Sequence, residues 1–262
     1  MMKLMMKLML MFFLALYLLL TAPLKAQADI AKSIDIAVMI ANSQESLVKI
    51  KDGIKQPILF IQGLDLAEVP TEWLKPFELA MNSEHSVYFF KWSKFDSIYK
   101  NRNLLLEAIK FLLSTYQDSN LTLVGYSAGG IIALLALDAI VDSIDPELSV
   151  ARINVQLVAA PVFGYNINKR PVTYLAVPFA GATSVKIGIG VFENLKNKNF
   201  KGCHQWITTN CHLDKHACIK GSIYPQQGDT AKARVKICET VSYLNNETHA
   251  SILAKAVSQI LK

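Results

Sequence analysis

The chain has 262 residues, 52% of them hydrophobic, and a formal net charge of +6 at neutral pH. This apolar content is ample for one large core, and a single α/β domain of this length is common. The net charge falls to +3 once an N-terminal leader that carries three lysines is removed. A balance that small, without a clustered basic stripe, gives no support to a nucleic-acid partner. Peripheral contact with an anionic membrane surface stays open.

The N-terminus has the layout of a secretory signal peptide. Lys3 and Lys7 form a short positive region, an apolar run covers 8–23, and Ala26 and Ala28 make an A-x-A cleavage pattern. Cleavage after Ala28 would give a mature chain that is periplasmic or secreted. The alternative is an uncleaved segment that tethers the protein to the membrane, but an apolar run of about 15 residues is short for a spanning helix, which needs roughly 20.

Apolar residues that alternate or run continuously predict strands, and apolar residues that recur every three to four positions predict helices. The first half contains, in chain order, a predicted helix over 31–44 with an early strand as its alternative, strands over 46–53 and 57–63, a short helix over 72–82, a strand over 86–92 and a helix over 101–116. Asn101 or Asn103 could cap the last of these helices.

The second half continues with a strand over 121–127, a helix over 128–144, a strand over 153–164, two last strands over 221–229 and 234–244, and a closing helix over 249–261. Residues 161–221 fit this alternation less well, and we interpret them as an insertion or cap, with a shorter helix as the alternative. The alternation predicts an α/β fold: a mostly parallel central sheet with helices on both faces and right-handed crossovers. Functional groups should gather where its strands end.

All four cysteines, Cys203, Cys211, Cys218 and Cys238, lie late in the chain. In an exported protein an even number favours disulfides. Three pairings are possible, and proximity in sequence suggests Cys203–Cys211 together with Cys218–Cys238.

The same segment also holds His204, His212 and His216, and mixed cysteine and histidine clusters can bind zinc. Their spacing matches no zinc pattern, and export favours oxidation of the cysteines. We therefore expect no metal and no other cofactor.

The stretch LTLVGYSAGGIIALLAL, residues 121–137, carries the main functional signal. A serine hydroxyl must protrude to act as a nucleophile, and a sharp turn between a strand and a helix achieves this when the residues two before and two after it are small. Gly125 and Gly129 occupy those positions around Ser127. The alternative is a small-residue turn that only packs a helix close to the sheet.

A nucleophilic serine needs a base, and an acid that orients the base. We expect the base to be His249, which lies between the last predicted strand and helix, rather than His204, His212 or His216. The predicted acid is Asp229, in a glycine-marked loop. Asp214 is the runner-up.

An oxyanion hole requires two backbone N–H donors. The residue after the nucleophile, Ala128, would supply one. The loop after the strand PILFIQG would supply the other, from Leu64 or, second, Gly63.

The order Ser127, Asp229, His249 and the GYSAGG turn resemble the α/β-hydrolase fold in its lipase/esterase-like branch, from about residue 56 to the end of the domain that spans 29–262. The chain departs from the pattern at Gln62-Gly63, where many members have His-Gly. The resemblance implies hydrolysis of a small-molecule or lipid ester through an acyl-enzyme. An acyltransferase or thioesterase with the same triad, or a catalytically silent binding protein, is the alternative.

Overall fold

The structure is a computed structural model, and it describes residues 24–63, 71–93, 96–141, 152–160, 203–208, 238–244, 247 and 251–262. The elements follow in this order: α2 (Leu24–Asn42), β1 (Leu47–Lys51), β2 (Lys55–Ile61), the 3-10 turn η1 (Thr71–Trp73), α3 (Leu74–Met81), β3 (His85–Phe90), α4 (Ile98–Thr115), β4 (Leu121–Tyr126), α5 (Ala128–Val141), β5 (Ile153–Val158), β6 (Cys203–Thr208), β7 (Cys238–Tyr243) and α9 (Ser251–Ile260).

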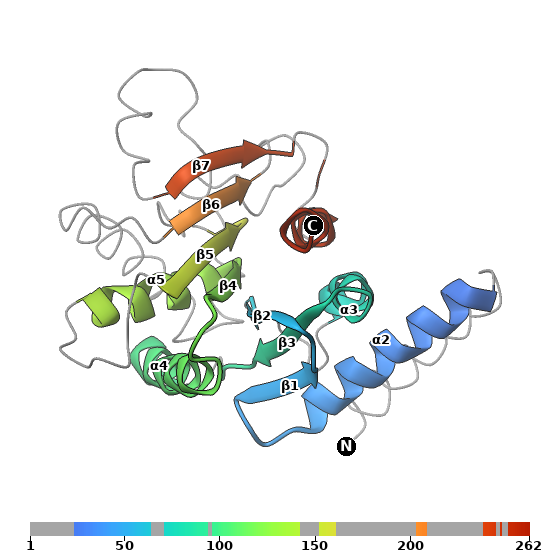
Figure 1. Cartoon of the computed structure of the whole chain (residues 1–262), viewed down its shortest axis with the longest axis horizontal. Coiled ribbons are helices and arrows are strands. Elements are labelled where there is room, and N and C mark those ends of the chain that lie inside the picture. The colour runs from blue at the N-terminus through green and yellow to red at the C-terminus, as the bar shows by residue number, and fades with distance from the viewer. Residues whose placement is uncertain are drawn as a thin grey trace, which may run out of the picture.

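Within these residues, the seven strands form one sheet in the order β1-β3-β2-β4-β5-β6-β7 (Figure 1). β1 is antiparallel to β3, and every other neighbouring pair is parallel. The predicted mostly parallel sheet is therefore confirmed. Parallel strands bring their carboxyl ends to one edge, so that edge is where functional groups are expected.

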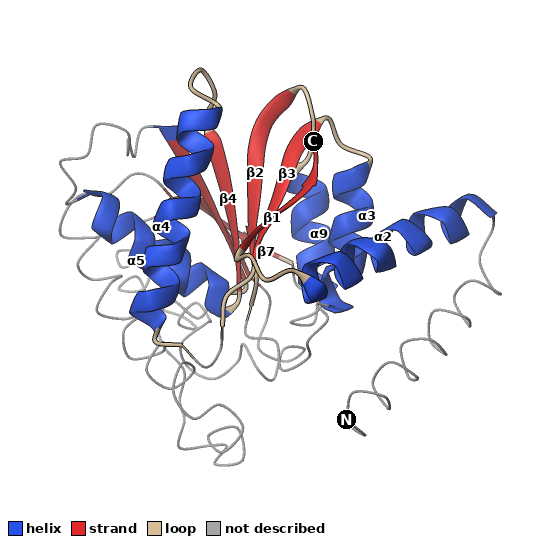
Figure 2. Cartoon of the chain, turned by 90° about the horizontal axis from the view of Figure 1, so that it is seen from below, coloured by secondary structure: helices blue, strands red, loops and turns tan. Residues whose placement is uncertain are grey.

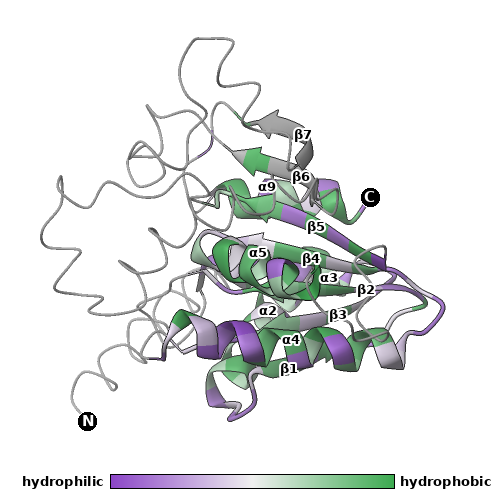
Figure 3. Ribbon diagram, turned by 90° about the vertical axis from the view of Figure 1, so that its left-hand side faces the viewer, coloured by the Kyte–Doolittle hydropathy of each residue, from purple (hydrophilic) through white to green (hydrophobic). Residues whose placement is uncertain are grey.

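Helices cover both faces of the sheet (Figure 2). α4 and α5 pack on one face with the inward residues of β2 to β5, and α2, α3 and α9 pack on the other. α5 is hydrophobic over most of its surface because it is buried almost all round, whereas α4 carries hydrophilic stretches (Figure 3). Each fully buried aliphatic side chain of this kind contributes about 1.5–3 kcal/mol.

The predicted helix over 31–44 is helical, as part of α2, and its strand alternative is wrong. The predicted cap of α4 is also wrong, because that helix begins earlier. The side chain of Ser97 accepts a hydrogen bond from the N–H of Lys100 at 3.1 Å. Asn101 lies inside the helix, fully buried, and its amide bonds the backbone of Ser93.

The strand β6 lies inside 161–221, the range interpreted as a cap, so six of those residues belong to the sheet. The predicted strand over 221–229 lies outside the described residues. β7 falls within the last predicted strand, and its register places Cys238 opposite Cys203 of β6.

The described N-terminal segment starts at Leu24, so most of the predicted signal peptide lies outside the described residues. α2 runs through the predicted cleavage site at Ala28, but its buried residues Ile36, Ala37 and Ile40 come later and would remain after cleavage. No helix within the described ranges is both long and apolar enough to cross a membrane.

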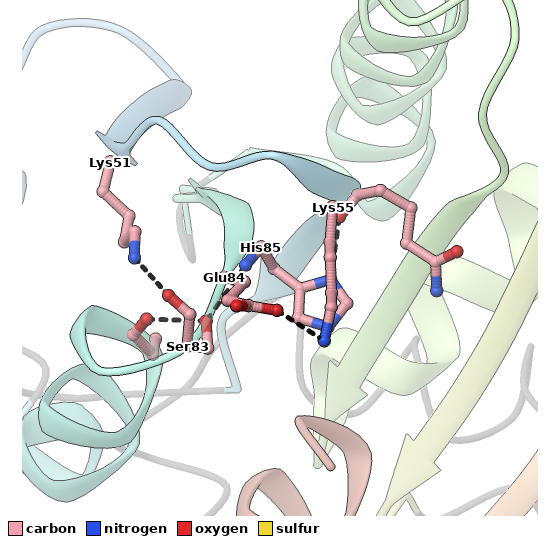
Figure 4. Close-up of polar contacts among 7 residues, drawn as sticks. Lys51, Lys55, Ser83, Glu84 and His85 are labelled. Atoms are coloured by element: carbon pink, nitrogen blue, oxygen red, sulfur yellow. Dashed lines mark hydrogen bonds and ion pairs between the residues drawn. The ribbon is translucent and has the colours of Figure 1, made fainter.

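A polar network ties β1, β2 and β3 together at the edge where β2 and β3 begin (Figure 4). Lys51 Nζ donates to the carbonyl of Ser83 at 2.5 Å, and Lys55 forms an ion pair with Glu84 at 2.8 Å. The Nδ1 of His85 lies 2.9 Å from the carbonyl oxygen of Gln56. These groups stabilise the amino edge of the sheet, which is opposite to the carboxyl edge where the candidate site lies.

Candidate active site

Ser127 occupies the single residue between β4 and α5. Its φ of 51° is uncommon for a residue other than glycine and carries a strain of about 1–3 kcal/mol. Two backbone hydrogen bonds hold this turn: Ser127 N–H donates to the carbonyl of Val158 at 2.8 Å, and Gly130 N–H donates to the carbonyl of Ser127 at 3.0 Å. The serine is half-buried, so part of its surface is accessible at the carboxyl edge.

Glycines on either side of Ser127 allow the strand and helix to approach closely. A Cβ at Gly129 would lie 2.3 Å from the carbonyl oxygen of Gln62, and one at Gly125 would lie 2.6 Å from the Cα of Gly130. Distances below 3 Å to backbone atoms are incompatible with a side chain there. The steric requirement inferred for these two positions is met by the geometry.

The end of β2 lies directly beside the turn. A Cβ at Gly63 would lie 2.8 Å from the ring of Tyr126 and 3.2 Å from the Cβ of Ser127. Tyr126 itself is buried and packs edge-on against Trp73, with ring centroids 5.9 Å apart. The backbone of Gly63 therefore borders the serine.

Of the two predicted oxyanion donors, Ala128 lies within the described residues and Leu64 does not. Ala128 is the first residue of α5, where N–H groups have no intrahelical acceptor and the helix dipole is positive. Leu64 lies just outside the described residues, and Gly63 is the last described residue before it. The donor from Leu64 stays a prediction, while the peptide that leads into Gly63 is in place beside the serine.

The sheet topology separates the histidines. His85 begins β3 and therefore lies at the amino edge, about 17 Å along the strand from the carboxyl edge that holds Ser127. His204 is the second residue of β6 and is likewise far from the end of its strand. Neither backbone position suits a base for Ser127.

The predicted base His249 and acid Asp229, together with the runner-up Asp214, lie outside the described residues. Glu247 and Ser251, which bracket His249 in sequence, are described. The carboxylate of Glu247 is buried and forms an ion pair with Lys255 of α9. Hydrogen bonds from the side chains of Lys255 and Ser251 hold the pKa of Glu247 below its usual value.

Two contacts at the carboxyl edge had no signal in the sequence. The first is the ion pair between Glu247 and Lys255 after β7. The second is a hydrogen bond from the indole Nε1 of Trp92 to the carbonyl of Gln62 at 2.5 Å. Both depend on chain segments that meet only in the folded protein. The described residues hold no group of three potential metal ligands.

In sequence, the chain matches no family model and no curated protein. In three dimensions it is similar to solved lipase and esterase-related structures. Lipase BlEst2 of Bacillus licheniformis, in mature form, has a TM-score of 0.55 at 13% identity, over 83% of this chain and 96% of that one. Lipase B of Aspergillus fumigatus has a TM-score of 0.53 at 14% identity, over 79% and 51% of the two chains.

A lipase-esterase related protein of Clostridium acetobutylicum ATCC 824 has a TM-score of 0.50 at 14% identity, over 83% of this chain and 98% of that one. Similarity at these identities is evidence of a common fold. The chain thus has the α/β-hydrolase fold. The fold expected from the GYSAGG turn and the alternation of strands and helices is confirmed.

Proposed function

We propose that the protein is a serine hydrolase that cleaves carboxylic esters, with Ser127 as nucleophile. One observation carries the proposal. Ser127 sits in a strained turn between a strand and a helix, at the carboxyl edge of an α/β-hydrolase sheet, beside the backbone of Gly63 and the N-terminus of α5. Backbone strain of this kind is concentrated at functional sites.

The reaction would follow from this arrangement in two steps. Ser127 Oγ attacks the ester carbonyl and passes its proton to His249, and N–H groups at Ala128 and at Gly63 or Leu64 stabilise the oxyanion. The carbon–oxygen bond to the alcohol then breaks, His249 protonates the leaving alkoxide, and an acyl-enzyme remains. Water, deprotonated by His249, releases the carboxylic acid and restores the serine.

The topology bears on which aspartate orients His249. Hydrogen bonds step across the carboxyl edge, from Ser127 N–H to the Val158 carbonyl and from Ala159 N–H to the Ile207 carbonyl, each at 2.8 Å. Thr208 and Tyr243 then end β6 and β7 side by side, in register. The segments that follow these two strands therefore start as neighbours at the edge that holds the serine.

Asp214 lies six residues after the end of β6, at whose carboxyl edge the serine lies. Asp229 lies nine residues before the start of β7, and that start is at the opposite, amino edge of the sheet. Nine extended residues span about 30 Å, so Asp229 can still reach the site, but only if the chain returns there. The shorter path favours Asp214, the runner-up of the sequence analysis. We propose it as the acid, in place of Asp229.

We also propose that the chain is exported, on the strength of its N-terminal pattern and its even number of cysteines. Signal-peptide cleavage would remove the first turn of α2 and keep its buried residues. N-terminal sequencing of the protein recovered outside the cytoplasm would test this, with Asp29 as the expected first residue. An intact N-terminus in a membrane fraction would instead support the tethered alternative.

The experiment compares the intact protein with Ser127→Ala on p-nitrophenyl esters of increasing acyl length. We expect at least a 1,000-fold loss of kcat, because a triad without its nucleophile loses roughly that much or more. Ser114→Ala is the matched control, since Ser114 is exposed on α4 and its hydroxyl, among the described residues, bonds its own helix at the carbonyl of Phe111. A fluorophosphonate should label the intact protein and fail with Ser127→Ala.

Equal ester hydrolysis by the intact protein and Ser127→Ala would overturn the proposal. No activity and no labelling in either protein would favour the silent binding protein. Product analysis with an added alcohol or thiol acceptor separates a hydrolase from a transferase, since a transferase would release mainly the new ester or thioester.

A further inference from the structure

Three contacts fix Gln62, two of them through its carbonyl, which belongs to the peptide that joins it to Gly63. Gln62 N–H donates to the carbonyl of Phe90 at 3.1 Å. Its carbonyl accepts the 2.5 Å hydrogen bond from Trp92 Nε1, and the same oxygen lies against the Cα of Gly129, where a Cβ would come within 2.3 Å. The carbonyl of Gln62 thus lies between the indole of Trp92, just after β3, and Gly129 in the first turn of α5.

A fixed carbonyl also fixes the N–H on the other side of the same peptide. The peptide unit is planar, and all described peptide bonds are trans, so the N–H of Gly63 points opposite to the carbonyl of Gln62. Gly63 borders Ser127. The hydrogen bond from Trp92 therefore sets the direction of a backbone donor, the N–H of Gly63, next to the proposed nucleophile.

Trp92 is itself held in place by its neighbours in sequence. The N–H of Lys91 donates to the carbonyl of Ser46 at 2.7 Å, and Lys91 Nζ donates to the carbonyl of Ser43 at 2.5 Å. On the other side, the fully buried Asn101 exchanges two hydrogen bonds with the backbone of Ser93. The indole is half-buried and packs against the core cluster of α4 and α5.

We propose that Trp92 is a positioning residue of the oxyanion hole: its indole N–H holds the Gln62–Gly63 peptide so that the backbone N–H of Gly63 is oriented beside the oxyanion formed at Ser127. This inference rests on the proposed ester hydrolysis. It also gives a reason why the chain can carry glutamine instead of histidine before Gly63, because the backbone is oriented by a residue from the neighbouring strand.

The test replaces Trp92 by phenylalanine and by 3-benzothienylalanine, which keeps the bicyclic shape and exchanges the N–H for sulfur. Loss of an oxyanion donor itself lowers kcat by about 100- to 1,000-fold, so misorientation of one should lower it by roughly 10- to 100-fold. We expect KM for p-nitrophenyl butyrate to stay within about threefold, because the trigonal substrate gains little from the oxyanion donors.

A boronic acid supplies a second readout. It forms a tetrahedral, anionic adduct with a nucleophilic serine, so its inhibition constant should rise by the same factor by which kcat/KM falls. A role of Trp92 in packing alone would not produce this proportionality. Trp73→Phe is the matched control, because in the described part of the chain the buried Trp73 Nε1 has no hydrogen-bond partner. Its kcat should stay within about threefold of that of the intact protein.

The outcomes are distinguishable. If the intact protein is active, Ser127→Ala is inactive and the benzothienylalanine protein keeps full kcat, the proposal for Trp92 is wrong while the proposed function stands. If kcat falls equally in Trp92→Phe and Trp73→Phe, or boronate affinity is unchanged, Trp92 does not position the oxyanion hole. If Ser127→Ala is as active as the intact protein, the proposed function itself fails.

Discussion

The residues up to the end of α5 and the residues after it build the candidate site in different ways. Before Val141, short connections join the elements, so the described strands β1 to β4 and the helices between them follow one another closely in sequence. After Val141, the described strands β5, β6 and β7 are separated by long segments. The first region would supply the proposed nucleophile, Ser127, and the peptide of Gly63, and the second would supply the base and the acid.

This difference explains which parts of the site follow from local sequence. The turn at Ser127 is specified within about ten residues, by a strand, a helix and two glycines. The base and the acid depend instead on where the chain goes after β6 and β7. Sequence distance is a weak guide to those positions, and the strand order is a better one.

The largest expected effect tests the assignment that the strand order favours in the second region. Asp214→Asn should lower kcat by about 1,000- to 10,000-fold, because a histidine without its carboxylate partner adopts the wrong tautomer. Asp229→Asn is the matched control and should keep kcat within a few fold. The measurement is kcat on p-nitrophenyl butyrate. The reverse pattern would restore Asp229 as the acid.

The next effect concerns the first region. Gly129→Ala would force a Cβ to 2.3 Å from the carbonyl oxygen of Gln62 and 2.5 Å from that of Ile61. Since both atoms belong to the backbone at the end of β2 and just after it, α5 must move, and we expect the free energy of unfolding to fall by about 3 kcal/mol. Urea unfolding measures the loss, and kcat should fall with it because the Gly63 peptide shifts.

Ala133→Gly provides the comparison inside the same helix, at a buried position without a steric conflict. It should cost about 1 kcal/mol through helix propensity and should spare kcat. A smaller loss for Gly129→Ala than for Ala133→Gly would mean that the close contact with β2 is not a constraint.

A smaller effect tests the loop after β7. Glu247→Gln removes the charge that pairs with Lys255, and kcat should fall by roughly tenfold because residues 247 and 251 bracket the proposed base. Glu84→Gln is the control, as that carboxylate forms an exposed ion pair with Lys55 at the amino edge (Figure 4). Equal kcat values for the two variants would show that the ion pair has no bearing on the site.

The same variant has a defined pH dependence of stability. The pKa of Glu247 is lowered in the folded protein by hydrogen bonds from Lys255 and then Ser251. A lowered folded pKa means that the stabilisation is full above the unfolded value and is lost as the pH falls through the folded value. The difference in Tm between the intact protein and Glu247→Gln should therefore be largest near neutral pH and disappear in strong acid.

Much of the fold could be predicted from the sequence, because the strands and helices have clear periodicity and the glycines around Ser127 match the pattern of a strand–turn–helix nucleophile. The predicted cap of α4 is wrong. Ser97, which caps the helix, lies outside the periodic pattern, and Asn101 is buried inside the helix, where its amide bonds the backbone of Ser93. β6 was missed as a strand because CHQWIT has no clear alternation, and it is identified by its pairing with β5 and β7.

The predicted disulfide between Cys203 and Cys211 rests on their proximity in sequence, which says little about their distance in the fold. Cys203 begins β6, and Thr208 ends it about 16 Å away, so a bond from Cys203 to Cys211 would require the chain to double straight back along the strand. The register instead places Cys203 opposite Cys238, which is distant in sequence. The pairing of Cys203 with Cys211 and of Cys218 with Cys238 stays a prediction, because Cys211 and Cys218 lie outside the described residues.

The smallest effect on activity is expected where the two regions meet. Arg152, just before β5, donates from one guanidinium nitrogen to the carbonyls of Tyr116 at 2.5 Å and Ser119 at 2.9 Å, beyond the end of α4. Arg152→Met should lower the free energy of unfolding by about 1–3 kcal/mol, as expected for hydrogen bonds to a charged group, and Tm by about 2–4 °C for each kcal/mol.

Arg102→Met is the matched control, because Arg102 lies on the exposed side of α4 and bonds Asn103 beside it. It should leave Tm nearly unchanged, and neither variant should alter kcat. A loss of kcat in Arg152→Met would mean that the joint between the two regions transmits strain to the turn at Ser127, through β5 and the bond from Ser127 N–H to Val158. An unchanged kcat with a lowered Tm would mean that the nucleophile is fixed by its own turn, independently of how firmly β5 is joined to α4.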